Sequence, residues 1–166
     1  MENQDQIYRN LQEHLDKETI GLPATPSGAE IRILKHLFTP EQAKAVMYLT
    51  YKLEPVEKIF ERVEEGGYTI DELAGHLAES AKYGVISYSK KEGVNHYGTL
   101  HYLIGMAEGG MHKGPTLEFV TAVEEYANDG QFWDRFMHGK VSQLRTIPIE
   151  ASIETKHEIG SYDALK

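Results

Sequence analysis

Hydrophobic residues recur at helical spacing in several short segments of this chain. Apolar side chains at positions i, i+3, i+4 and i+7 lie on one face of a helix, so the spacing predicts amphipathic helices. Three of these helices are preceded by a Ser or Thr with a Glu or Gln three residues later, which is the capping-box sequence. The predicted helices span residues 7–15, 31–38, 43–50, 56–63, 70–82, 117–127 and 132–137, and the capping pairs are Ser27 with Glu30, Thr39 with Gln42, and Thr69 with Glu72.

The helix over residues 70–82 is followed by two segments with strand character. Gly84 ends the helix, and residues 85–90 and 96–104 are joined by a turn that contains Gly93. Two short helices followed by a hairpin are the order of a winged helix-turn-helix. The pattern therefore predicts an α+β fold that is mostly α. The helix side expected to face the core carries Ile70, Leu73, Ala74, Leu77 and Ala81.

Three parts of the chain are expected to share one core. Residues 1–26 form an N-terminal helix and a linker rich in proline and glycine, and residues 27–104 form the winged-helix domain. Residues 105–166 form C-terminal helices and an extended tail, beginning with a glycine-rich loop at 105–115. The side chains expected to point inward in this last part are Leu117, Phe119, Val120, Val123, Phe132, Trp133, Phe136 and Met137.

The composition is that of a soluble globular protein. Of the 166 residues 40% are hydrophobic, and 26 acidic against 17 basic side chains give a formal net charge of -9. No apolar run approaches the roughly 20 residues that span a bilayer, and the polar N-terminus lacks the features of a secretory signal peptide. We therefore expect a cytoplasmic protein that does not enter a membrane.

The last predicted helix before the hairpin decides whether such a domain could read DNA. A recognition helix needs exposed Arg, Lys, Asn or Gln side chains to contact base edges. The outward positions here carry Asp71, Glu72 and Glu79 against one lysine, so a polyanion would be repelled. DNA binding would also need Arg32 and Lys35 to lie on the same side as the lysines of the hairpin. The residues expected to contact DNA, if it is bound, are Lys82, Lys90, Lys91 and His76.

The sequence contains none of the motifs that would indicate catalysis or metal binding. There is no cysteine to form a disulfide or to ligate zinc or an iron–sulfur cluster. None of the eight histidines lies in an H-E-x-x-H sequence, and the G-x-S-x-G elbow of serine hydrolases is missing. We therefore expect a protein that is not an enzyme and holds no metal or cofactor.

Aromatic residues in and after the hairpin exceed what a small hairpin needs. They form a core if the C-terminal helices fold back on the hairpin, or a dimer or partner surface if they stay exposed, since aromatic residues are favoured in interface cores. A pocket between hairpin and C-terminal helices would instead suit a small ligand. The candidate residues for this surface or pocket are Tyr88, Tyr97, His112, Trp133 and Phe136.

The stretch GLPATPSGAEIRILKHLFTPEQA resembles the opening of a family of bacterial and archaeal 4Fe-4S ferredoxin-type proteins. In that family G-x-P-x-T-x-S-G-x-E precedes a helix ending in L-F-T-P-E-x-A, and residues 144–166 and the hairpin region resemble the same family. Its members carry cysteine clusters in a C-terminal domain, so a chain without cysteine is expected to be a separate N-terminal module or a relative that lost the redox domain. The matching residues are Gly21, Pro23, Thr25, Ser27, Gly28, Glu30, Leu37, Phe38, Thr39, Pro40, Glu41 and Ala43.

These observations lead to one main prediction and two alternatives. The main prediction is a non-catalytic winged-helix module that forms a homodimer or docks onto a redox or other protein partner. The first alternative is a dimeric winged-helix transcription regulator that binds DNA, and the second is a small-molecule sensor. The acidic helix before the hairpin favours the main prediction over DNA binding.

Overall fold

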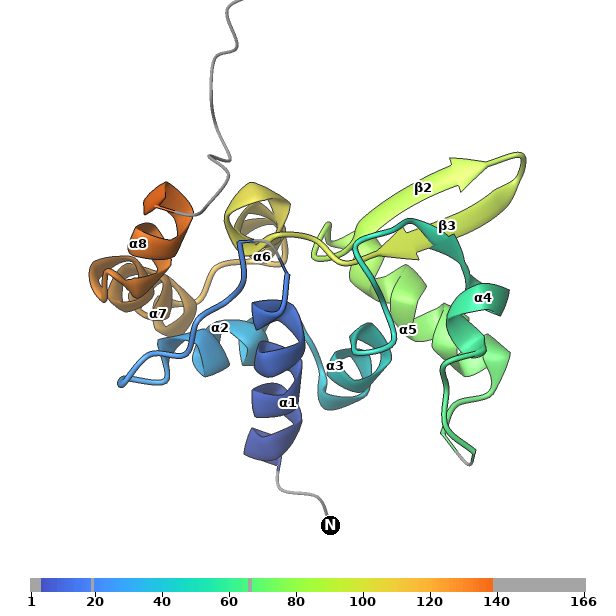
Figure 1. Cartoon of the computed structure of the whole chain (residues 1–166), viewed down its shortest axis with the longest axis horizontal. Coiled ribbons are helices and arrows are strands. Elements are labelled where there is room, and N and C mark those ends of the chain that lie inside the picture. Colours follow the sequence, from blue (N-terminus) through green and yellow to red (C-terminus); the bar gives the residue numbers. More distant parts are fainter. Residues whose placement is uncertain (1–3, 19, 66, 139–166) are drawn as a thin grey trace, which may run out of the picture.

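Helices make up most of the structure, a computed structural model that describes residues 4–18, 20–65 and 67–138. A small antiparallel sheet lies at one end, and its hairpin projects beyond the helices (Figure 1). The predicted α+β class, mostly α, is therefore confirmed. The predicted extended tail lies outside the described residues. The helices are α1 (Gln4–Asp16), α2 (Ala29–Leu37), α3 (Pro40–Val46), α4 (Val56–Phe60), α5 (Ile70–Lys82), α6 (Ala107–His112), α7 (Leu117–Asn128) and α8 (Gln131–His138), with a π-helical segment η1 (Tyr102–Met106); the strands are β1 (Glu54–Pro55), β2 (Ser87–Lys91) and β3 (Val94–Gly98).

The hairpin is formed by β2 and β3, and β1 pairs with the other edge of β3. Its turn consists of Glu92 and Gly93, which both have positive φ, 50° and 85°. Two such residues are typical of a type I′ turn, whose twist matches that of the strands. The expectation of a second strand as far as residue 104 is wrong. It ends at Gly98, because Thr99 leaves the hairpin and its N–H donates to the carbonyl of Thr50 at 2.8 Å.

One hydrophobic core joins the N-terminal, middle and C-terminal parts of the described chain. Helix α1 packs against α2 and α3, α3 packs against α5, and α7 covers α2. Figure 1 shows α7 and α8 at the end of the molecule opposite the hairpin. The hairpin therefore stands away from the C-terminal helices. Fully buried core residues include Leu11, Ile33, Leu34, Val46, Leu73, Leu77 and Ala122.

Two of the three predicted capping boxes are formed. The hydroxyl of Thr39 accepts from the backbone N–H of Gln42 at 3.3 Å, and the Gln42 side chain accepts from the N–H of Thr39 at 2.9 Å. Thr69 and Glu72 make the same pair of bonds at 3.3 and 2.8 Å. Both boxes satisfy backbone donors that the first turn of a helix leaves without partners. They fix the starts of α3 and α5.

The third predicted box, at Ser27, is wrong. Helix α2 starts after Gly28, which has φ 65° and no side chain to cap it, and the N–H of Ala29 donates to the hydroxyl of Thr25 at 3.2 Å. Glu30 is completely buried, and its Oε2 accepts from the hydroxyl of Thr25 at 2.6 Å and from the N–H of Thr25 at 3.1 Å. Its Oε1 lies 3.0 Å from Nη2 of Arg9 on α1. The carboxylate therefore joins α2 to the linker and to α1 instead of capping its own helix.

Distant segments hold the linker between α1 and α2. The side chain of Gln12 donates to the carbonyl of Leu22 at 2.6 Å, and the hydroxyl of Tyr126 on α7 donates to the carbonyl of Pro23 at 3.2 Å. Gly21 has φ 76°, and a Cβ there would lie 2.7 Å from a carboxylate oxygen of Asp16. A glycine is needed because both the backbone conformation and the space exclude a side chain.

The caps give a first prediction. Thr69→Ala should lower the free energy of unfolding by about 1 kcal/mol, because it removes the acceptor for one backbone N–H of α5. Ser27→Ala should change it by less than about 0.5 kcal/mol, as expected of an exposed residue outside such features. Urea unfolding followed by circular dichroism measures both. Equal losses in the two variants would contradict the assignment of Gly28 as the start of α2.

The glycine-rich segment expected to be a loop is helical, so that prediction is wrong. Helix α6 covers most of it and is pressed against its neighbours. A Cβ on Gly109 would lie 2.7 Å from the carbonyl oxygens of Tyr83 and Gly84, and one on Gly110 would lie 2.8 Å from Leu37 and would also meet Phe119. The glycines therefore permit close packing in this helix rather than a flexible loop.

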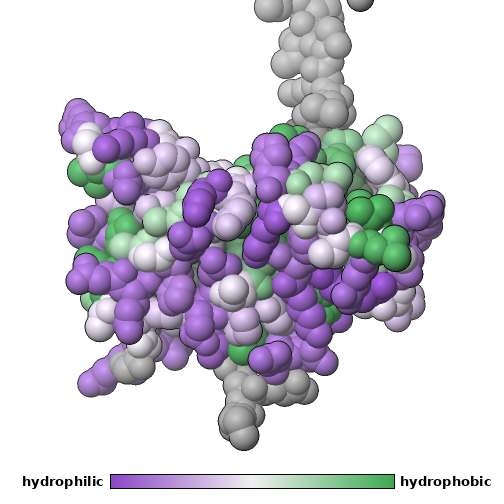
Figure 2. Space-filling view, turned by 180° about the vertical axis from the view of Figure 1, so that it is seen from behind, coloured by the Kyte–Doolittle hydropathy of each residue, from purple (hydrophilic) through white to green (hydrophobic). Residues whose placement is uncertain are grey.

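The inward faces of α7 and α8 also differ from the prediction. Leu117 is 84% exposed and Val120 is 44% exposed, while Phe119 is buried and stacks on the ring of His36 at 4.1 Å. On α8, Trp133 is exposed by 40%, and Met137 is exposed more strongly. Figure 2 shows hydrophobic surface on the side of the molecule that carries these two helices. The contact of α7 with α2 sets this orientation, which periodicity alone does not specify.

Among the described residues no helix combines the length and the apolar character needed to span a membrane.

Candidate protein-interaction site

The hairpin and α5 enclose a groove made of two hollows. One, of about 230 Å³, is lined by Ala78, Ala81, Tyr88 and Tyr97, among others, and the second, of about 250 Å³, lies nearer the start of α5. Asn95 lines both hollows, so they meet on β3. Small side chains on α5 leave this space open along the helix.

Exposed apolar residues form the centre of the second hollow. Ile70 at the start of α5 is 38% exposed, and Val94 at the start of β3 is 46% exposed. Val56 and Ala74 line the same hollow. The expectation that Ile70 faces the core is therefore wrong. Ile70 begins α5 and lines the hollow instead.

Acidic residues line this hollow, and basic residues end the neighbouring strand of the hairpin. Glu57 and Asp71 line the hollow on the helical side, and both are exposed. Lys90 and Lys91 end β2 and pair across the hairpin with Asn95 and Val94. Within the described part of the chain none of these four side chains makes an ion pair or a hydrogen bond. The hollow is therefore lined by two carboxylates, and the end of β2 next to it carries two ammonium groups.

The residues expected to contact DNA are not gathered on one positive surface. Lys82 lies 4.0 Å from Glu79 and 5.6 Å from the centre of the Tyr83 ring. His76 is half-buried against the ring of Tyr68, with centroids 5.4 Å apart. Lys90 and Lys91 are the exposed bases of the hairpin.

The two basic residues that a regulator would need on the same side lie on α2. Arg32 pairs with Glu125 of α7, and Lys35 lies 2.6 Å from Asp5 of α1. Figure 1 places α2 among the helices below the sheet and the hairpin at the far edge of the molecule. The basic residues are thus divided between two parts of the surface, and those on α2 already have acidic partners.

The five aromatic and histidine candidates are divided among three places. Tyr88, which is 50% exposed, and the buried Tyr97 lie in the groove, with ring centroids 5.7 Å apart. Trp133 and Phe136 lie on α8, where Phe136 belongs to the core. His112 is exposed at the end of α6. Two of the five predicted residues therefore lie in the groove.

Sequence reasoning missed Glu57, Asp71 and Val94 as members of one site. The only sequence signal was the unusual position of a valine directly after a hairpin turn, where a side chain projects from the end of the sheet. Nothing in the local sequence places α4 beside the start of α5 and the hairpin. That arrangement comes from the packing of α4 against α5, β1 and β3.

No cluster of three or more His, Cys, Asp or Glu side chains that could hold a metal ion occurs in residues 4–18, 20–65 and 67–138.

Comparison of the chain with known protein families, curated proteins and solved structures found no match.

Proposed function

We propose that this protein is a non-catalytic winged-helix module that forms a homodimer through the hairpin end of its α5 groove. The order α3, β1, α4, α5, β2, β3 and the sheet order β1-β3-β2 support the winged-helix assignment. In this order α5 occupies the place of the recognition helix and the hairpin that of the wing. The exposed acidic residues of α5 favour a protein partner over DNA.

The observation that carries the proposal is the self-complementary distribution of charge. A twofold dimer uses the same patch on both copies, so residue i of one copy meets residue j of the other and the reverse. In a dimer built around Ile70 and Val94, we expect Glu57 and Asp71 of each copy to meet the lysines of the other. The apolar centre would be covered at the same time, which removes exposed hydrophobic surface from water.

The resemblance to ferredoxin-type proteins supports a shared fold rather than a shared site. The residues of the motif that are described here have roles in folding: Gly21 allows a close approach, Pro23 accepts a hydrogen bond, and Thr25 and Glu30 bind each other. Docking onto a redox partner and a cytoplasmic location stay predictions. These 166 residues contain no cysteine that could ligate an iron–sulfur cluster.

Charge reversal tests the dimer directly. Glu57→Lys with Asp71→Lys should weaken self-association roughly tenfold or more, because two attractive contacts per half become repulsive. Lys90→Glu with Lys91→Glu should have the same effect. A mixture of the two double variants should associate again, since each then offers the charge that the other lacks. Sedimentation velocity over a range of concentrations, at low and high salt, measures all three samples.

A matched control reverses charges elsewhere on the surface. Glu13→Lys with Lys17→Glu changes one exposed residue of α1 and one exposed residue just after it, and should leave association unchanged. A wild-type protein that stays monomeric at low salt, or a mixture that fails to associate, would overturn the proposal. Titration with random duplex DNA at about 50 mM salt tests the alternative function. If the protein binds this DNA and Lys90→Glu with Lys91→Glu abolishes the binding, the function is that of a DNA-binding regulator and not of a dimerisation module.

A further inference from the structure

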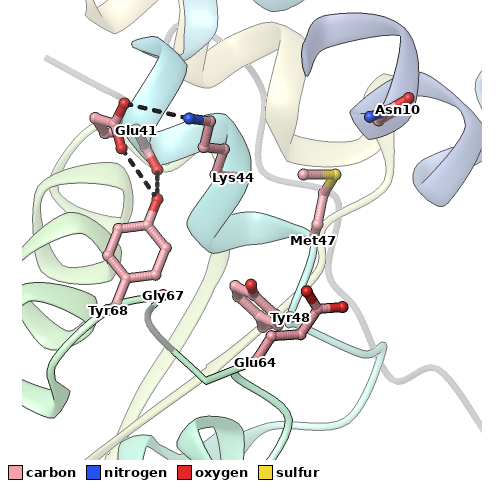
Figure 3. A pocket seen from close by; sticks show the side chains of 8 residues that line it. All are labelled: Asn10, Glu41, Lys44, Met47, Tyr48, Glu64, Gly67 and Tyr68. Carbon is pink, nitrogen blue, oxygen red and sulfur yellow. Dashed lines mark hydrogen bonds and ion pairs between the residues drawn. The ribbon is translucent and has the colours of Figure 1, made fainter. Parts of the chain in front are cut away.

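A separate hollow of about 650 Å³ opens between α1, α3 and the turn that joins α4 to α5 (Figure 3). It shares no lining residue with the groove beside the hairpin. Its volume falls within the range of about 300–1,000 Å³ that is typical of small-molecule sites. None of the residues predicted from sequence as candidates for a ligand lines it.

Two tyrosine rings form one wall of this hollow. The rings of Tyr48 and Tyr68 are perpendicular, with their centroids 6.3 Å apart. The hydroxyl of Tyr68 donates to the backbone carbonyl of Glu41 at 2.7 Å, which holds this ring in place. Burial and the nearby carboxylate of Glu41 raise the pKa of Tyr68 far above its ordinary value, so the phenol keeps its proton. The wall is therefore aromatic and uncharged.

One carboxylate at the hollow remains without a partner. The Glu41 carboxylate is engaged, with one oxygen 3.7 Å from Nζ of Lys44 and the other 3.4 Å from the Tyr68 hydroxyl. Glu64 makes no ion pair and no side-chain hydrogen bond with any described residue. Figure 3 shows its carboxylate beside Tyr48 at the border of the hollow. The site therefore offers a negative charge next to aromatic rings.

The opposite side of the hollow provides a hydrogen-bond donor and an apolar contact. The amide oxygen of Asn10 accepts from Gln6 at 2.8 Å, which leaves its N–H₂ group to donate elsewhere. Figure 3 shows this nitrogen turned towards the hollow and the thioether of Met47 pointing into it. Methionine adapts its shape to irregular apolar groups. A ligand with a cationic head and a short polar tail would satisfy both sides.

We propose that this hollow binds an organic ammonium ion, with its cationic head against Tyr48 and Tyr68 and beside the carboxylate of Glu64. Cations are attracted to the faces of aromatic rings, and recognition of quaternary ammonium groups by aromatic side chains is a common use of this attraction. A methylated ammonium loses less hydration than a primary amine when it leaves water. It also places methyl groups against the rings and Met47.

Choline and its uncharged isostere 3,3-dimethylbutan-1-ol are suitable probes. Titration of the full chain, followed by NMR of the tyrosine ring protons and the Gly67 amide, should show saturable shifts with choline and at least about tenfold weaker binding of the isostere. Tyr48→Phe should retain binding because it keeps an aromatic face. Tyr48→Leu should weaken it about tenfold.

Glu64→Gln should weaken choline binding about fivefold through loss of charge. Glu61→Gln, at the exposed residue that directly follows α4, is its matched control. Equal binding of choline and the isostere would overturn the proposal, as would binding of acetate in place of choline or an unchanged affinity in Glu64→Gln. The charge-reversal variants at the hairpin should bind choline normally. A loss of self-association and a loss of choline binding would therefore be separate results.

Discussion

Glu30→Ala is expected to lower the free energy of unfolding by about 2–3 kcal/mol, because it leaves buried hydrogen-bond donors without their acceptor. The substitution would leave the Thr25 hydroxyl and N–H without their acceptor and would remove the carboxylate 3.0 Å from Arg9. Desolvated donors without partners are costly because water cannot reach them. Urea unfolding followed by circular dichroism measures the loss.

A double-mutant cycle with Arg9→Ala separates the ion pair from the bonds to Thr25. The coupling energy between Arg9 and Glu30 should be well below the total loss in Glu30→Ala, since Thr25 supplies two of the three contacts. Glu13→Ala on the exposed side of α1 serves as the control and should change stability by less than about 0.5 kcal/mol. A loss below about 1 kcal/mol in Glu30→Ala would contradict the buried position of this carboxylate.

Phe132→Ala is the second large effect, with an expected loss of about 3–5 kcal/mol. The Phe132 side chain is buried, and its ring meets those of Tyr102 and Tyr126 at centroid distances of 5.8 and 5.6 Å. Truncation would remove a large apolar surface and leave a cavity between α7, α8 and η1. Met137→Ala on the exposed side of the same helix should cost less than about 0.5 kcal/mol.

The readout for this prediction can distinguish global from local unfolding. Trp133 is the only tryptophan, and its ring lies 5.4 Å from that of Phe132, so its fluorescence reports on α8. If α8 belongs to the common core, fluorescence and circular dichroism transitions should coincide and shift together in Phe132→Ala. A shift of the fluorescence transition alone would mean that α8 unfolds independently.

Half of the candidate site was accessible from local sequence. The lysines of the hairpin were identified as possible DNA contacts, and Tyr88 and Tyr97 as part of an excess of aromatic residues in and after the hairpin. Glu57 and Asp71 were not identified from the sequence, because their role depends on α4 and α5 lying beside the turn of the hairpin. Ile70 was placed on the wrong side, since apolar spacing continues through a helix turn whether or not a neighbour covers it.

The sequence by itself determined the number and type of most elements. Starts at Thr39 and Thr69 are local, because a capping box satisfies backbone donors within four residues of the chain. The hairpin turn is local as well, because Glu92 and Gly93 adopt the two positive φ values that it requires.

Tertiary structure alone decided which groups were buried and which faces met. Glu30 does not cap α2 because its carboxylate binds Thr25 and Arg9 inside the protein. The glycines of α6 are helical because close packing against Phe119 and Gly84 compensates for their low helix propensity. Leu117 is exposed because α7 packs against α2 with the face that carries Phe119. Each outcome depends on contacts between residues far apart in the chain, and periodicity within one element carries no information about them.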